Sequence, residues 1–443
     1  MNLFIIFLDV LFLIAIGYSI GNLFLFDKSY SSLKKFSLSY ALGFGIVGIQ
    51  LFLFFIAGIK WNILNILAPW VVMFFVYLTK KEDLLIKFKD INIFRKVKRL
   101  SNFEKILILS IFSLILFVGI ESVMRPIQAW DGWGNWVLKS NVFYTKNGID
   151  PYYFKYTGDE YPLIIPLTVT FGYITIGEID DAAILLFYFT FYLSLGALFF
   201  TESKKFLGLK LSLIFTFLLL STQNLIRHGG RYEVGQADLA VGFCIFAGSM
   251  LLFDYLKFKT KRSLLLLSII LGIASQIKND TLPFVVLSFL IIIFFTIKSK
   301  RYSNLVALLP LPLLLLSWNL FKVVNHLHGN YLVKNILNIQ FSRIPDVFLA
   351  MLKELFNLQN WNLLWVVFII CLFVFSHEIK KNWLFIAIVL FQLLSYMLAF
   401  LITPADPISQ IAGASNKLYL HIAPLAVLII GLLISKSVKP IFT

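Results

Sequence analysis

The sequence predicts an all-α fold, a polytopic bundle of about 13 transmembrane helices with a further half-span. Hydrophobic residues make up 59% of the 443 residues and the mean hydropathy is +0.87, whereas soluble domains are about 45–50% apolar. Apolar stretches long enough for a helix to cross a bilayer recur from end to end. Runs such as 264–273 do not alternate, as the strands of a membrane barrel would.

Basic residues gather in short loops between the apolar runs. The formal charge of +16 would suggest nucleic acid in a soluble protein, but this distribution is typical of cytoplasmic loops, and no nucleic-acid partner is expected. Cys244 and Cys371 lie in apolar runs, so neither a disulfide framework nor a thiolate metal site is predicted. The first apolar run is predicted to be a span rather than a cleaved signal.

The basic loops set the predicted topology. The longest basic segment, 80–105, is expected in the cytoplasm. Residues 162–177 are apolar but short and carry Pro162 and Pro166, so we predict a half-span or tilted helix there. Full spans are predicted near 4–26, 37–58, 63–79, 106–123, 182–201, 207–222, 236–256, 263–277, 281–297, 303–321, 360–376, 383–402 and 419–435.

The loops predicted to lie outside hold most of the unusual polar residues. Ionisable groups collected at one membrane face indicate a functional site. His326 and His328 are spaced for a metal in a strand, but no carboxylate cluster accompanies them, so a solvated loop is preferred. The outside loops are 124–161, 223–238, 278–280, 323–360 and 403–421.

The segment 130–139 offers the first candidate residues. If it is helical, Asp131, Asn135 and Lys139 share one face. Asp131 would then act as a general base or orienting carboxylate, and Lys139 would contact an anionic group. Trp130, Trp133 and Asn135 are further substrate-binding candidates. The alternative is an interfacial belt, because Trp favours the headgroup region without any chemistry.

A second acidic pair closes the same loop. Asp159 and Glu160 could approach Asp131, so that carboxylates would surround one acceptor hydroxyl. The alternative is that these acids cap a helix that starts with proline. Asp131, Asp159 and Glu160 are therefore the catalytic candidates.

Basic residues of the other outside loops are candidates for holding a phosphate. Arg227, His228 and Arg231 lie in a glycine-rich, charged loop and could clamp one; the alternative is an ion-pair network that only fixes the loop. Asp238, a further substrate-binding candidate, starts an apolar span, where a carboxylate is costly unless it is paired or wet. Two further basic candidates are Lys278 and Lys417.

Taken in order, several motifs resemble those of GT-C-type membrane glycosyltransferases. They are WDGWGNWVLK (130–139), YPLIIP (161–166), ADLA (237–240), KND (278–280) and KLY (417–419) with Pro424. The chain looks most like the prokaryotic enzymes that use polyprenyl-phosphate sugars, which are related to protein mannosyltransferases and the lipid A aminoarabinose transferase. The resemblance covers the chain from about residue 106 onward, and residues 1–105, predicted as N-terminal spans and a basic cytoplasmic loop, have a role that it leaves open. Residues 106–443 form the GT-C-like catalytic module, with its extracytoplasmic loop at 124–161.

The resemblance implies sugar transfer from a polyprenyl-phosphate carrier to the hydroxyl of a glycan, lipid or protein, at the extracytoplasmic face of the cell membrane. It implies that Asp131 is catalytic and that basic residues of other outside loops hold the donor phosphate. No cofactor is predicted, and a divalent metal requirement stays open. This sequence departs from the family in three ways: the catalytic loop commonly follows the first span, whereas here three further spans come earlier; Gly132 and Gly134 replace alanine; and Lys417 replaces arginine.

Other functions remain open at this point. A transporter or flippase for a lipid-linked or anionic solute would also use charges at the membrane edge, but it should place ionisable groups near mid-span. An O-antigen ligase or polymerase-like enzyme would depend on outside arginines and histidine more than on Asp131. No P-loop or paired-glycine nucleotide motif is present, so a glycosyl donor would need to be borne by the membrane.

Overall fold

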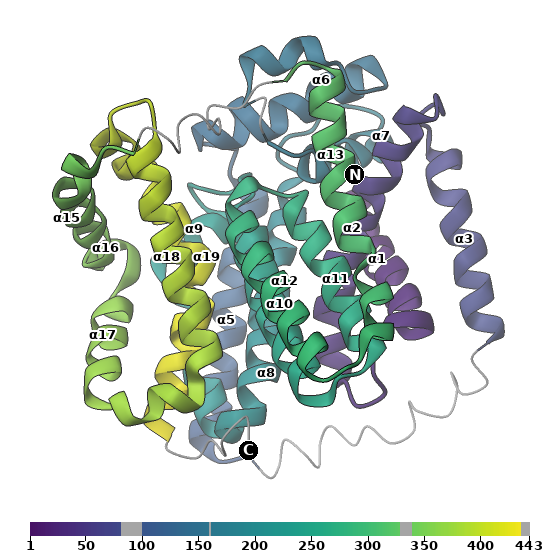
Figure 1. Ribbon diagram of the computed structural model, residues 1–443. Coiled ribbons are helices and arrows are strands. Elements are labelled where there is room, and N and C mark those ends of the chain that lie inside the picture. Colours follow the sequence, from purple (N-terminus) through teal and green to yellow (C-terminus); the bar gives the residue numbers. More distant parts are fainter. Residues whose placement is uncertain (81–99, 159–160, 328–338, 436–443) are drawn as a thin grey trace.

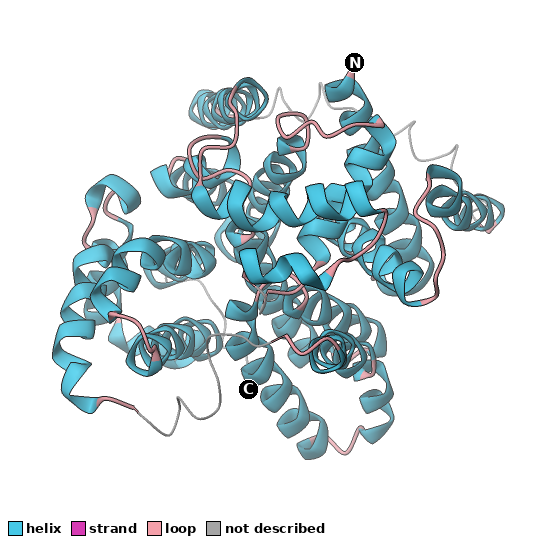
Figure 2. Ribbon diagram, turned by 90° about the horizontal axis from the view of Figure 1, so that it is seen from above, coloured by secondary structure: helices cyan, strands magenta, loops and turns pink. Residues whose placement is uncertain are grey.

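The computed structural model describes residues 1–80, 100–158, 161–327 and 339–435, and this part of the chain contains helices and no strand (Figures 1 and 2). The all-α prediction is confirmed. The helices are α1 (Asn2–Ile20, continued by a π-helix over Gly21–Leu25), α2 (Ser32–Ile56), α3 (Ile63–Thr79), α5 (Asn102–Met124), α6 (Leu138–Lys146), α7 (Ile164–Ile176), α8 (Leu185–Leu220), α9 (Gln223–Gly230), α10 (Asp238–Phe258), α11 (Lys261–Ser275), α12 (Leu282–Lys298), α13 (Pro310–Val324), α15 (Ile344–Leu355), α16 (Leu358–Trp361), α17 (Leu364–Val374), α18 (Trp383–Ile402) and α19 (Pro407–Ser435).

Nine helices within the described ranges are long and apolar enough to cross a membrane, and three shorter apolar helices accompany them. Some of them turn their apolar side chains outward. On α5, Leu109 is 64% exposed and Phe112 is 60% exposed. So much exposed apolar surface is typical of a helix that faces lipid. The structure therefore supports a membrane protein, while the predicted number of spans is not confirmed.

Helix α10 lies at the centre of the bundle. It is buried along its length and packs against α8, α11 and α19. Its two buried carboxylates stand near its opposite ends, at Asp238 and Asp254. Their Cα atoms are separated by about 24 Å along the axis, at 1.5 Å per residue.

The end of α10 near Asp254 is closed by a network of buried charges. Lys34 Nζ, at the start of α2, lies 2.9 Å from a carboxylate oxygen of Glu202 on α8 and 2.7 Å from one of Asp254. Lys205 Nζ lies 2.6 Å from the other oxygen of Glu202. Buried charges are tolerated when they are paired, so this network ties three helices together at the end predicted to be cytoplasmic.

Helix α8 is a hairpin of two arms. Gly208 interrupts it with φ 73° and ψ −178°. Beyond this bend the chain turns back, because Leu220 lies against Gly196 and its carbonyl accepts a hydrogen bond from Tyr192 Oη at 2.8 Å. The arms correspond to the two spans predicted near 182–201 and 207–222.

Helix α7 corresponds to the segment predicted as a half-span or tilted helix. It has 13 residues, which extend about 20 Å, less than the roughly 30 Å of a hydrocarbon core. It is buried over most of its length and packs against α1, α2 and α6. A short helix at this depth is tolerated because other protein elements surround it.

The prediction of an outside loop over 403–421 is wrong, because α19 already begins at Pro407. The carboxylate of Asp406 accepts a hydrogen bond from the backbone N–H of Ser409 at 2.8 Å, as an N-cap does. An acid followed by proline is a helix-start signal that the sequence carried. Lys417 and His421 therefore lie on a helix.

We predict that Gly208→Ala destabilises the protein by about 1–3 kcal/mol, because the backbone at this bend lies in a region that only glycine adopts without strain. Gly413→Ala is the matched control. Position 413 is helical and a Cβ there meets no atom within 4 Å, so alanine should be neutral or slightly stabilising. Thermal unfolding in detergent measures both, and equal melting temperatures would contradict the hairpin geometry.

Candidate functional site

Asp131 opens a stretch of π-helix over Gly132–Val137. Such wide turns are rare and are frequent at functional sites. The carboxylate of Asp131 forms an ion pair with Lys417 Nζ of α19, and its side chain is 36% exposed. Asp131 is thus accessible and lies beside the Lys417 ammonium, although the two residues belong to different predicted outside loops.

Asn135 and Lys139 both hold the loop that follows α6. Asn135 Oδ1 accepts a hydrogen bond from the backbone N–H of Gly158, and Lys139 Nζ donates to its carbonyl. Lys139 is buried. Both are engaged by the protein itself, so the structure gives them a role in positioning this loop. The catalytic candidates Asp159 and Glu160 lie outside the described residues.

The tryptophans of the same segment are turned toward the surface. Trp130 is 70% exposed and Trp133 is 46% exposed, and their rings meet edge to face with centroids 4.5 Å apart. This placement agrees with the interfacial alternative as well as with substrate binding.

A second and more deeply buried ion pair begins α10. Lys278 Nζ donates to Asp238 Oδ1 at 2.7 Å and lies 2.9 Å from Asp280 Oδ2. Burial disfavours the charged amine, but the two carboxylates outweigh it and hold the pKa of Lys278 well above its ordinary value. Lys278 is therefore a permanent cation in this cluster.

His421 completes the coordination of Asp238. Its Nε2–H donates to Asp238 Oδ1 at 3.0 Å, and its Nδ1 accepts from the Tyr396 hydroxyl at 2.9 Å. Gln392 Nε2 in turn donates to the Tyr396 oxygen at 2.9 Å. This chain of hydrogen bonds is satisfied by a neutral imidazole.

Helix α19 brings the two carboxylates into one site. Lys417 and His421 are four residues apart, so they lie on the same face with their Cβ atoms about 6 Å apart. Lys417 binds Asp131 and His421 binds Asp238. A partner of the exposed carboxylate and a partner of the buried one therefore lie one helical turn apart on α19, while the cation of Asp238 is Lys278.

Three side chains of this site could ligate a metal. Ligand atoms of Asp238, Asp280 and His421 lie within 4.8 Å of one another. Oxygen and imidazole ligands suit several divalent cations, but the Lys278 ammonium already binds both carboxylates. A divalent cation and Lys278 would compete for the same oxygens.

The two arginines of the predicted clamp of Arg227, His228 and Arg231 bind different partners. Arg227 donates to Asn360 Oδ1 at 2.5 Å, and Arg231 Nε lies 3.0 Å from Glu121 Oε2 on α5. His228 is fully buried, and burial lowers the pKa of its imidazole. A neutral His228 gives no charge to a phosphate clamp.

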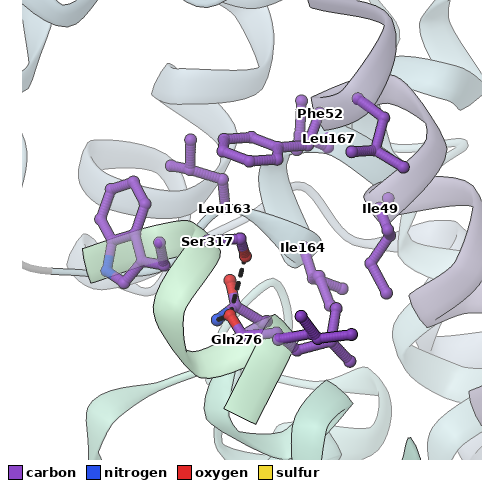
Figure 3. Close-up of a pocket in the computed structure, with 12 residues that line it drawn as sticks. Ile49, Phe52, Leu163, Ile164, Leu167, Gln276 and Ser317 are labelled. Atoms are coloured by element: carbon purple, nitrogen blue, oxygen red, sulfur yellow. Dashed lines mark hydrogen bonds between the residues drawn. The ribbon is translucent and has the colours of Figure 1, made fainter. Parts of the chain in front are cut away.

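An apolar cleft of about 300 Å³ lies between α2, α7 and α13 (Figure 3). One residue of its wall, Gln276, precedes Lys278 of the buried ion pair by two residues in the chain. The lining is almost entirely aliphatic and aromatic, which suits a hydrocarbon chain. Labelled lining residues are Ile49, Phe52, Leu163, Ile164, Leu167, Gln276 and Ser317.

Sequence reasoning left Asp280, His421 and Tyr396 out of the candidate site. The spacing of four residues between Lys417 and His421 would place both on one face of a helix, but this segment was predicted to be a loop. The contact of Tyr396 with His421 is not visible in the sequence, since the two residues belong to different helices, α18 and α19.

The chain matches no protein-family model, no curated protein and no solved structure. The function is therefore argued from the chemistry of the site.

We predict that Lys278→Met lowers the free energy of unfolding by about 3–5 kcal/mol, because it leaves the Asp238 carboxylate buried and without its cation. In the double variant with Asp238→Asn the loss should fall short of the sum of the single losses by about 1–3 kcal/mol. Denaturant titration checks the cycle, with exposed Lys60→Met as a control expected within about 0.5 kcal/mol of wild type. Additive losses would mean that the pair is not coupled.

A second expectation concerns pH. The folded protein keeps His228 neutral, whereas the unfolded chain binds a proton at about pH 6.5. The contribution of this group to stability is therefore complete above pH 6.5 and declines as the pH falls below it. Melting curves between pH 7.5 and 5 should show a shallower decline for His228→Gln than for wild type; parallel curves would contradict this assignment.

Proposed function

We propose that this chain is an integral membrane glycosyltransferase that moves a sugar from a polyprenyl-phosphate carrier to an acceptor hydroxyl at the extracytoplasmic face. The observation that carries the proposal is the pairing of an accessible carboxylate, Asp131, with Lys417, which lies one helical turn before His421, a partner of the buried Asp238. An accessible carboxylate suits an acceptor hydroxyl, and the lysines suit a phosphate.

In this mechanism Asp131 takes the proton of the acceptor hydroxyl as the acceptor oxygen bonds to the anomeric carbon of the sugar. The bond between that carbon and the phosphate oxygen breaks, and its electron pair leaves with the lipid phosphate. Lys417 stabilises the charge that develops on the leaving phosphate. Because Lys417 is paired with Asp131 before substrate binds, a donor phosphate that attracts this lysine also frees the carboxylate.

The apolar cleft supports a lipid-borne donor. Its wall includes Gln276, two residues before Lys278 in the chain, so we infer that a ligand with a hydrocarbon chain in the cleft would carry its polar head toward the charged cluster. A soluble nucleotide sugar would make no use of such a surface.

A transporter for a lipid-linked or anionic solute is the second candidate. Asp9 favours it, because this carboxylate lies about 10 Å along α1 from Asn2 and is only 7% exposed. Its side chain accepts a hydrogen bond from Thr175 on α7 at 2.5 Å. A buried carboxylate inside a candidate span is the feature expected of a transport pathway.

We predict that purified wild-type protein transfers sugar from a polyprenyl-phosphate sugar in a panel of donors and acceptors, and that Asp131→Asn reduces the rate by about 10²- to 10⁴-fold, the usual contribution of a general base. Transfer is measured with radiolabelled donor in lipid nanodiscs.

Glu178→Gln is the control, since Glu178 is exposed and bonds only to Asn2 among the partners given by the structure. It should retain the wild-type rate. Equal rates in Asp131→Asn and wild type would remove Asp131 from the mechanism. No turnover of any donor, together with lipid or solute movement lost in Asp9→Asn, would favour the transporter.

A further inference from the structure

Three buried polar side chains beside the two ion pairs each keep one atom without a hydrogen-bond partner among the described residues. The atoms are Asn224 Oδ1, His228 Nε2 and Gln236 Oε1. The side chains belong to α9 and the turn that follows it, and each residue is at most 2% exposed. Buried polar atoms are rarely left unpaired, because an unpaired one costs free energy.

All three atoms are acceptors. Asn224 Nδ2 donates to the carbonyl of Asn416 at 2.7 Å, which leaves the amide oxygen as the unpaired atom. Gln236 Nε2 donates to Glu233, with the same result. His228 Nδ1 faces the carbonyl of Asn224 at 3.0 Å and must carry the proton there, so Nε2 keeps its lone pair.

These acceptors lie next to the proposed catalytic groups. Asn224 and His228 are four residues apart on α9 and so share a face, and Asn224 binds the residue before Lys417. The charges of Asp238 and Lys417 both act on the His228 ring. Gln236 precedes Asp238 by two residues in the chain.

A ligand that binds these three acceptor atoms must supply hydrogen-bond donors. A phosphate offers only acceptors and negative charge, so three lone pairs would repel it. Burial also lowers the pKa of His228, which keeps its ring neutral and its lone pair available. A group with several hydroxyls supplies donors of this kind.

We propose that Asn224, His228 and Gln236 form a hydroxyl-binding subsite for a sugar ring, separate from the lysines that face phosphate. This inference rests on the proposed function for the identity of the ring, which belongs either to the donor sugar or to a glycan acceptor. It reverses the expected role of His228, from a cationic phosphate contact to a neutral acceptor of sugar hydroxyls.

The test is equilibrium binding to the full chain in nanodiscs, with three probes: undecaprenyl phosphate, undecaprenyl-phosphate hexose and a soluble methyl hexoside. His228→Leu removes the acceptor, and His228→Gln keeps an oxygen near the position of Nε2. His377→Leu, at an exposed histidine of another segment, is the control.

We expect His228→Leu to weaken sugar binding about three- to tenfold, the value of one hydrogen bond to a neutral group, and His228→Gln to restore most of it. Binding of undecaprenyl phosphate without sugar should not change. Weakened binding of the lipid-linked hexose alone assigns the subsite to the donor, and weakened binding of the methyl hexoside alone assigns it to the acceptor.

Two outcomes would overturn the subsite: an equal loss for undecaprenyl phosphate, which means that His228 serves the phosphate or the fold, or unchanged sugar binding in folded His228→Leu. If that variant does not fold, Gln236→Leu gives the same comparison from the turn. Absence of sugar transfer by wild type, with sugar binding still dependent on His228, would reject the enzyme and keep the subsite.

Discussion

The burial of Asp238 is the constraint on which this end of the molecule depends. The helix that it begins is surrounded by protein, so its carboxylate needs partners from other elements. Lys278 reaches it from the turn after α11, and His421 reaches it from α19. Because His421 sits one turn beyond Lys417, the same requirement also places Lys417 where it meets Asp131. The exposed ion pair is therefore aligned by the buried one.

Much of this helical architecture could be predicted from composition and charge. The side-chain contacts between helices could not. Runs of apolar residues predicted most helices. The sequence also showed that the Asp238 carboxylate, at the start of an apolar helix, needs a partner or water. Its partners were not, because they follow it by 40 and 183 residues and no local pattern records such contacts. The loop predicted over 403–421 was wrong for a local reason. Polar residues in the first turns of α19 favoured a loop, whereas Asp406 and Pro407 are a helix-start signal.

The contacts of the basic residues change how they should be interpreted as candidate phosphate-binding groups. Sequence reasoning treated cations on outside loops as free to bind a phosphate, yet each acquires a partner in the fold. Arg227 meets Asn360, Arg231 meets Glu121, and Lys278 meets two carboxylates. A ligand anion at this end has to exchange with an existing partner, so selectivity depends on which pair opens most readily. The pair between Asp131 and Lys417 is more exposed to water than the pair between Lys278 and Asp238.

The hairpin of α8 bears on how the chain enters a bilayer during synthesis. Its second arm, residues 209–220, extends about 18 Å, which is too short to span a hydrocarbon core of roughly 30 Å alone. The contacts of Leu220 with Tyr192 and Gly196 join it to the first arm. The two arms should therefore leave the translocon together as one folded pair joined at the Gly208 bend.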